Sequence, residues 1–95
     1  MDKCVIYVRD GLQISSREQW NECARYAKRY NLSIEHKIFD IRGDRFQEAV
    51  DKTVFTNDID NLIVYNRKAM SNDMDEVLFN QIYLNHFGAK LHIVN

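Results

Sequence analysis

An apolar run, an amphipathic segment and a second apolar run follow one another in KCVIYVRDGLQISSREQWNECARYAKRYNLSIEHKIFD, which spans residues 3–40. Residues 4–8 are continuously apolar, as in a strand covered on both faces, whereas residues 34–39 contain charged positions typical of an edge strand. Between them, one stripe at helical spacing is formed by Trp20, Cys23, Ala24 and Ala27. Ser15 followed by Glu18 is a capping-box pattern for the start of that helix. The stretch therefore predicts a strand–helix–strand unit with parallel strands and a right-handed crossover.

The same alternation continues along the rest of the sequence. Residues 62–65 and 91–94 are further apolar runs, which we expect to be strands covered on both faces. A second helical stripe is formed by Phe46, Ala49, Val50, Thr53 and Val54. A third is formed by Met74, Val77, Leu78 and Ile82. The order βαβαβαβ predicts an α/β fold with three layers, in which helices cover both faces of a four-stranded, mainly parallel sheet.

Local signals predict where the second and third helices begin and end. Asp44 with Gln47 has the spacing of a cap and its partner for the second helix. Ser71 or Asn72 is the expected cap of the third helix. Gly88 stands where a glycine in the left-handed region would end that helix.

Composition limits the class of protein. The 95 residues form a single domain, with 45% hydrophobic and 28% charged residues. Thirteen basic and 14 acidic residues give a net charge of −1, which argues against binding of nucleic acid or membrane by bulk charge. Cys4 and Cys23 have neither metal-ligand spacing nor a disulfide framework, so we expect small buried thiols in a cytoplasmic protein.

Charged residues gather where the predicted strands end. The carboxyl ends of parallel strands meet at one edge of the sheet, which is where ligands bind in this class of fold. The crevice there would be lined by Arg9, Asp10, Asp40, Arg42, Arg45, Arg67, Lys68 and Ser71. Because five of these eight are cationic, we expect a positive local field and a site for phosphate or another anion. The alternative is that the cations pair with neighbouring aspartates and only solvate the loop ends.

Several kinds of site find no support in the sequence. The turn after the first strand has one glycine, Gly11, whereas a dinucleotide fingerprint needs three. His36, His86 and His92 are scattered without metal-ligand spacing, so we expect neither a metal nor a cofactor. Ser15 is better explained as a helix cap than as a nucleophile.

An ordered series of short motifs resembles the catalytic domain of the serine recombinases, the resolvase/invertase family. The motifs, in chain order, are Ile6-Tyr7-Val8-Arg9, Ser15-x-x-x-Gln19, Ala24-Arg25-Tyr26-Ala27, Ile38-Phe39-Asp40, Gly43-Asp44-Arg45, residues 59–65 and residues 87–93. The resemblance covers essentially the whole chain and implies a resolvase-like topology, related to the Rossmann and flavodoxin arrangements. It also implies that residues 1–95 are the catalytic core alone, without the long dimerisation helix and the DNA-binding region.

The resemblance breaks at the catalytic residues. In the family a serine hydroxyl attacks a DNA phosphodiester while arginines stabilise the charge on the phosphoryl oxygens. Arg9 and Arg45 match two of those arginines, but Gly11 stands at the nucleophile position. After the third strand the family has Asp-Arg-Leu-Ser-Arg, whereas this chain has Lys68-Ala69-Met70-Ser71-Asn72, in which only the serine is retained. The relics of the site are thus Arg9, Arg45 and Ser71, and weak anion binding would fall to Arg9, Arg45, Arg67 and Lys68.

These departures favour a catalytically inactive, recombinase-like module that interacts with a recombinase, a phage or host protein, or a second copy of itself, in a phage or mobile-element setting. Weak DNA contact is compatible with this hypothesis, whereas membrane binding and a small-molecule substrate have no support. One alternative is a divergent minimal recombinase domain that cleaves DNA together with a partner chain. A second is a receiver-like signalling domain, with Asn66 where the phosphoacceptor aspartate would stand.

Overall fold

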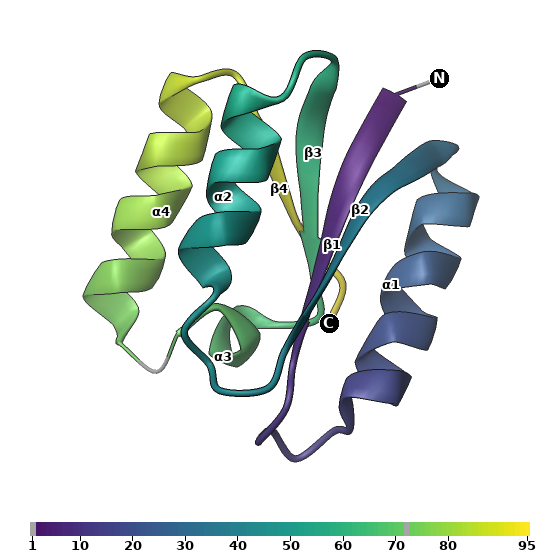
Figure 1. Ribbon diagram of the computed structural model, residues 1–95, viewed down its shortest axis with the longest axis vertical. Helices are drawn as coiled ribbons and strands as arrows, with labels where there is room; N and C mark the ends of the chain where they lie inside the picture. The colour runs from purple at the N-terminus through teal and green to yellow at the C-terminus, as the bar shows by residue number, and fades with distance from the viewer. Residues whose placement is uncertain (1, 72) are drawn as a thin grey trace.

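The computed structural model describes residues 2–71 and 73–95. Its strands are β1 (Asp2–Arg9), β2 (Leu32–Asp40), β3 (Ile59–Val64) and β4 (Lys90–Ile93). Its helices are α1 (Ser16–Arg29), α2 (Phe46–Phe55), α3 (Arg67–Met70) and α4 (Met74–His86). The strands pair in parallel in the order β2-β1-β3-β4, with β1 and β3 at the centre (Figure 1). The predicted α/β class and parallel sheet are confirmed.

Helices cover both faces of the sheet and complete three layers. α1 lies on one face, and α2 and α4 lie on the other (Figure 1). On the α1 side, Cys23 and Ala27 pack against Cys4, Ile6 and Ile63. α1 connects β1 to β2 on one face of the sheet. After β2 the chain passes to the opposite face, where α2 and α4 lie.

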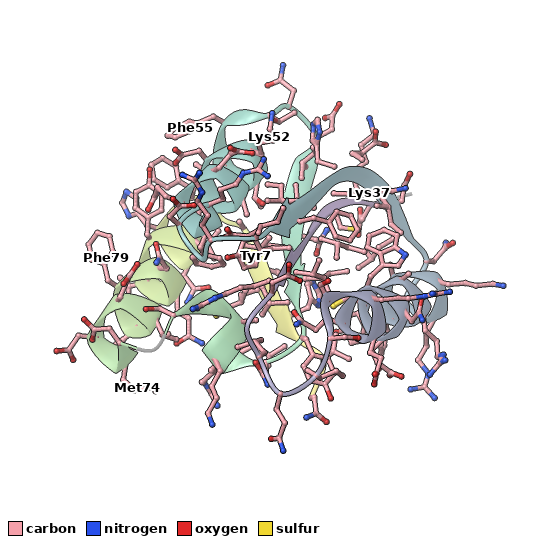
Figure 2. All side chains as sticks on the ribbon, turned by 60° about the horizontal axis from the view of Figure 1, so that its bottom comes forward. Tyr7, Lys37, Lys52, Phe55, Met74 and Phe79 are labelled. Carbon is pink, nitrogen blue, oxygen red and sulfur yellow. The ribbon has the colours of Figure 1, made fainter. Side chains whose placement is uncertain are left out.

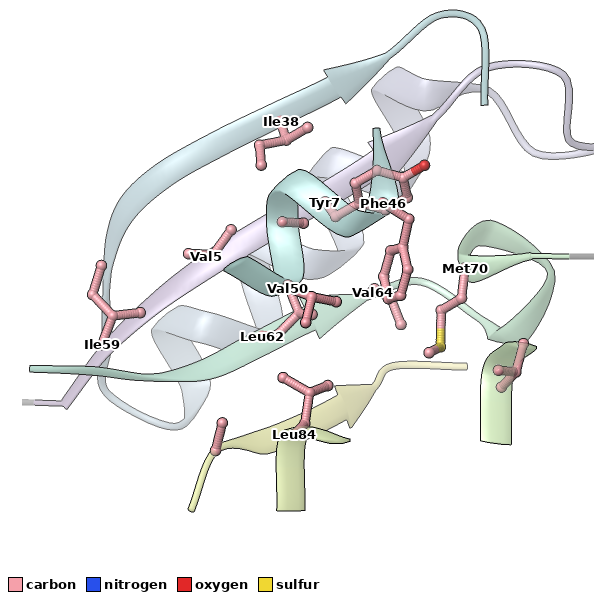
Figure 3. Packing of buried hydrophobic residues seen from close by; sticks show 13 residues of the cluster. Val5, Tyr7, Ile38, Phe46, Val50, Ile59, Leu62, Val64, Met70 and Leu84 are labelled. Carbon is pink, nitrogen blue, oxygen red and sulfur yellow. The ribbon is translucent and has the colours of Figure 1, made fainter. Parts of the chain in front are cut away.

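The larger core cluster lies between the sheet and the helices α2 and α4. Figure 3 shows it around Tyr7, Leu62 and Val64 of the central strands, with Phe46 packed edge-on against the Tyr7 ring. Residues 4–8 and 62–64 are fully buried, in agreement with their continuous apolar sequence. Each buried Val, Leu or Ile side chain contributes about 1.5–3 kcal/mol, so the central strands provide the base on which the loops of the site rest.

Two expectations about burial are wrong. In the α4 region the predicted stripe is largely exposed, with Met74, Leu78 and Ile82 at 62%, 56% and 61%, while Val77 and Leu84 face the sheet. Because α4 has apolar residues on both of its sides, periodicity alone does not select the side that packs. The short strand β4 is half-buried rather than covered on both faces, since it forms an edge of the sheet.

Helix ends follow local chemistry, with two differences. Ser15 Oγ accepts from Glu18 N at 3.2 Å, as predicted for α1, and Gly88 has the expected positive φ of +75°. The predicted cap Asp44 is wrong for α2, which begins after Arg45 without a side-chain cap. α4 is capped by Asp73 rather than by Ser71; the alternative cap, Asn72, lies outside the described residues.

Candidate functional site

The candidate residues lie on three loops at the carboxyl ends of β1, β2 and β3. This edge includes the point between β1 and β3 where the chain leaves the sheet toward opposite faces, the usual place for a site in such folds. The loops do not enclose one crevice. They border two separate clefts, one beside Arg9 and one beside Gly11.

Arg9 is fixed through its backbone by Gln19 of α1. Arg9 N donates to Gln19 Oε1 at 3.1 Å, and Gln19 Nε2 donates to Arg9 O at 2.7 Å and to Ile14 O at 3.0 Å. Gln19 is fully buried, and it joins the end of β1 to the loop that leads into α1. A buried amide with all these groups paired rigidifies its surroundings, so the position of Arg9 is set by the fold.

The guanidinium of Arg9 lies against the β2–α2 loop. A Cβ on Gly43 would be 2.9 Å from Arg9 Nε and 3.0 Å from its Cζ, so the approach depends on the missing side chain. Gly43 also has a φ of +81°, which glycine adopts at little cost. On its other side Arg9 donates through Nη1 to Lys68 O at 3.4 Å, while its buried Nε has no protein partner among the described residues.

Asp40 holds the β2–α2 loop in this shape. Its carboxylate accepts from the N–H groups of Gly43 at 2.7 Å, Asp44 at 3.3 Å and Arg45 at 2.8 Å, and from the hydroxyl of Tyr7. Burial by itself raises the pKa of Asp40, but these hydrogen bonds outweigh it and bring the pKa below its ordinary value. Burial, and then the bond to Asp40, raise the pKa of Tyr7. Asp40 is therefore a structural anion that orders the loop.

Arg45 is paired with groups other than those of the Arg9 cleft. Its Nη2 donates to Glu48 Oε2 at 2.6 Å, and its Nη1 donates to Phe39 O at 3.2 Å. The hydrogen bond and charge of Glu48 raise the pKa of Arg45. Arg45 does not line the cleft that contains Arg9, so the structure does not bring these two candidate arginines into one pocket.

The cleft beside Arg9 has a volume of about 340 Å³ and contains Ser71. Ser71 Oγ accepts from Asp73 N and donates to Glu76 Oε2, both at 3.0 Å. Three carboxylates, those of Asp44, Asp73 and Glu76, line this cleft with Arg9 as its only cation among the described residues. The charge balance is therefore negative, which differs from the positive crevice expected from the sequence. The reason is that the acidic start of α4 lies here while Arg45 and Arg67 lie elsewhere.

The second cleft, of about 800 Å³, contains Gly11, Arg67 and Lys68. Gly11 has a φ of +87°, and a Cβ built on it would meet no heavy atom within 4 Å. The two serines after it, Ser15 and Ser16, are not among the residues that line either cleft. Neither of these two serines therefore supplies a hydroxyl to the cleft that contains Gly11.

Sequence reasoning assigned no role at the site to Gln19 or Gly43, although both shape the surroundings of Arg9. Each was noted only as part of a resembling motif. A glutamine in the first turn of an otherwise amphipathic helix and a glycine after a strand are weak signals individually. Their importance depends on Arg9, which is distant from Gly43 in sequence but adjacent in space.

Residues 2–71 and 73–95 contain neither a metal-binding cluster nor a membrane-spanning helix. No group of His, Cys, Asp and Glu side chains in this part of the chain is arranged to hold a metal ion. None of its helices is long and apolar enough to cross a membrane. Cys4 and Cys23 are free and buried as expected, and burial raises their pKa values to about 11 and about 12.

Comparison with known proteins places this geometry among solved structures. No protein-family model and no curated protein matches the sequence. The N-terminal catalytic domain of TP901-1 integrase is 17% identical, with a TM-score of 0.84 over 99% of this chain and 78% of that one. A resolvase family site-specific recombinase from Streptococcus pneumoniae is 16% identical, with a TM-score of 0.84 over 99% of this chain and 72% of that one.

A third structure is the C-terminal catalytic domain of ISC1926 TnpA, an IS607-like serine recombinase. It is 16% identical, with a TM-score of 0.80 over 98% of this chain and 70% of that one. All three similarities extend over 98–99% of this chain. The chain therefore has the fold of the serine recombinase catalytic domain.

Proposed function

We propose that this chain is a catalytically inactive serine-recombinase-like domain, which acts as an interaction module in the DNA recombination of a phage or mobile element. The fold supports the link to recombination. The single observation that carries the inactivity is Gly11 at the nucleophile position implied by the family resemblance. Glycine has no oxygen with which to form a covalent bond to DNA phosphate.

Charge around Arg9 supports the same proposal. A phosphodiester that entered the Arg9 cleft would face three carboxylates, whereas catalysis of phosphoryl transfer requires donors aimed at the developing charge. Arg45 is already paired with Glu48. One well-placed donor stabilises the transition state by about 2.7–4 kcal/mol. Because Arg45 does not line the Arg9 cleft, the activation barrier would be raised further, beyond the effect of the missing hydroxyl.

The test of inactivity is covalent-adduct formation. Purified protein is incubated with short duplex DNA at low salt and analysed on a denaturing gel, with an active serine recombinase as the positive control. We expect no protein–DNA adduct and no cleaved strand. An adduct formed by the wild-type chain would overturn the proposal.

The outer side of α4 supports the interaction role. Four large apolar side chains on α4 are more than half exposed: Met74, Leu78, Phe79 and Ile82. Figure 2 shows Met74 and Phe79 directed away from the sheet, with Phe55 of α2 on the same side of the molecule. A contiguous apolar patch of this kind is typical of a protein-binding surface. We call these four residues the α4 patch.

We assign a second copy of this chain as the partner of the α4 patch. The first turn of α4 carries Asp75 and Glu76, and its last turn carries His86, with Lys90 following in β4. Two α4 helices packed antiparallel about a twofold axis would place each acidic end against the basic end of the other. Opposed helix dipoles and complementary charges would then flank an apolar centre.

Sedimentation velocity tests this assignment. We expect a concentration-dependent dimer for the wild-type chain and a monomer for Leu78→Asp. Ile41→Asp is the matched control, because Ile41 is also apolar and exposed but lies on the β2–α2 loop. A monomeric wild-type chain at high concentration, or equal dissociation by both variants, would contradict the homodimer.

A divergent recombinase that works with a partner chain is a second candidate. Ser71 and Arg9 line the same cleft, which is the one observation in its favour. It predicts that Ser71→Ala and Arg9→Ala each abolish recombination in cells that contain the partner. Unchanged recombination in both variants would reject it.

A further inference from the structure

The cleft that contains Gly11 lies at the switch point between β1 and β3. It is bordered by the β1–α1 loop on one side and by the turn from β3 into α3 on the other. Its volume of about 800 Å³ falls within the range of about 300–1,000 Å³ that is usual for small-molecule sites. The interaction role proposed above rests on the α4 patch, and none of the four residues of that patch lines this cleft.

Two cations line the cleft. Arg67 and Lys68 are consecutive residues of α3, and neither has a carboxylate within ion-pair distance among the described residues. The only acidic side chain in the lining is that of Glu18, whose carboxylate accepts from Ser15 Oγ at 3.5 Å. The charge balance of the side chains favours an anion, in contrast to the Arg9 cleft. Guanidinium and ammonium groups together bind phosphate well.

The rest of the lining combines apolar surface with free polar groups. Leu12, Ile14 and Ile93 present half-buried aliphatic side chains, and Tyr65 adds an aromatic ring. Asn66 accepts from Ala69 N through Oδ1 at 2.9 Å, which fixes its amide and leaves Nδ2 available as a donor. A flat ring would pack against this surface while its polar edge meets the amide.

The β1–α1 loop adds backbone donors. The N–H groups of residues 11–14 form no hydrogen bond within the described part of the chain, whereas Asp10 N donates to Asp40 O. Gly11 leaves open space beside them, since no heavy atom would lie within 4 Å of a Cβ there. Gln19 anchors this loop through Ile14 O, so its donors are held in place before a ligand arrives.

We propose that this cleft binds a small phosphorylated ring compound of the nucleoside monophosphate class. Arg67 and Lys68 contact the phosphate, and the surface of Leu12, Ile14 and Tyr65 contacts the ring. The same chemistry is found in a free mononucleotide and at the phosphorylated end of a DNA strand. The sequence predicted an anion site that includes Arg67 and Lys68 but gave no support for a small-molecule substrate, because the cleft forms only where residues 11–14 meet residues 65–68.

Titrations followed by NMR test the proposal. The probes are adenosine 5′-monophosphate, adenosine, inorganic phosphate and a 5′-phosphorylated single-stranded tetranucleotide. We expect the monophosphate to bind more tightly than adenosine or phosphate, with shifts concentrated at residues 11–14 and 65–68. Tighter binding of the tetranucleotide would assign the site to a DNA end, and weaker binding would assign it to a free nucleotide.

Charge variants separate the site from general attraction of anions. The double variant Arg67→Ala, Lys68→Ala is expected to weaken monophosphate binding at least tenfold. Arg42→Ala is the matched control, because Arg42 is an exposed arginine of the β2–α2 loop that lines neither cleft. The proposal is overturned by absence of binding at millimolar monophosphate, by equal weakening in the control variant, or by shifts centred on the Arg9 cleft. None of these outcomes bears on covalent DNA cleavage, so the inactivity proposal is judged separately.

Discussion

Replacement of Asp40 by asparagine tests whether one buried carboxylate organises the loop beside Arg9. Asp40 is 1% exposed and accepts four hydrogen bonds, from Tyr7 and from the N–H groups of Gly43, Asp44 and Arg45. Asparagine retains only one side-chain oxygen. Its NH₂ group must therefore face either the N–H of Arg45 or the N–H groups of Gly43 and Asp44. A donor then opposes a donor in a buried position.

The expected loss of stability follows from these contacts. A hydrogen bond to a charged group contributes about 1.5–3 kcal/mol, and an unsatisfied buried donor costs about 1–3 kcal/mol. Some relaxation of the loop offsets part of this sum, so we expect a decrease of about 3 kcal/mol in the free energy of unfolding. For a domain of this size such a decrease lowers Tm by about 12–24 °C.

Thermal and urea unfolding at several pH values measure this effect. Since the folded pKa of Asp40 is lowered, the ionised carboxylate stabilises the fold above its unfolded pKa of about 3.9 and loses this effect as pH falls through the folded value. The difference between wild type and Asp40→Asn should therefore shrink below about pH 4. Asp44→Asn, an exposed change in the same loop, is the control. A difference under about 1 kcal/mol at pH 7, or one independent of pH, would refute the reasoning.

Three further changes have expected outcomes. Gln19→Leu should lower the free energy of unfolding by about 2–4 kcal/mol, because it removes a fully buried amide and leaves the part-buried backbone groups of Arg9 unpaired. Gly43→Ala should destabilise the protein by about 1–2 kcal/mol more than Gly11→Ala, since both have positive φ but only Gly43 touches Arg9. Burial, and then the charge of Lys90, lower the pKa of His92 below its ordinary value of 6.5. The free energy of unfolding should therefore fall as pH drops from about 6.5 through the folded pKa of His92. His92→Gln should remove that part of the pH dependence in urea unfolding.

Controls for these changes come from the same chain. Gln47→Leu replaces an exposed helical glutamine and should leave stability within about 0.5 kcal/mol of wild type. Equal losses for Gln19→Leu and Gln47→Leu would show that the buried amide has no special role. For His92, the partners Tyr26 and Asn61 hold Nδ1 and Nε2 at 2.8 Å each, so a flat stability curve between pH 7 and pH 5 would argue against this network.

Periodicity and local chemistry predicted the elements of the fold well. The central strands at residues 4–8 and 62–64 are buried on both faces, and continuous apolar sequence is the direct signature of that environment. The cap at Ser15 depends on residues three apart and was also predictable. The packed side of α4 was not, because apolar residues lie on both of its sides and periodicity therefore does not distinguish them.

The candidate site was only partly predictable. Sequence order shows which residues follow each strand, and Arg9, Gly11, Ser71, Arg67 and Lys68 do lie at the expected edge of the sheet. It does not show which of them share a cleft. Arg45 illustrates the limit, since its own helix supplies Glu48 as a closer partner than any group in the cleft.

Sequence by itself determined the order of the strands and of the three longer helices, the parallel sheet and the absence of a hydroxyl at position 11, because each depends on local pattern or on residue identity alone; the short helix α3 was not predicted. Only the tertiary structure decided the sign of charge in each cleft. Charges act through space: the fold brings Asp73 and Glu76 into the cleft that contains Arg9, whereas Arg67 and Lys68 line the cleft beside the loop that contains Gly11.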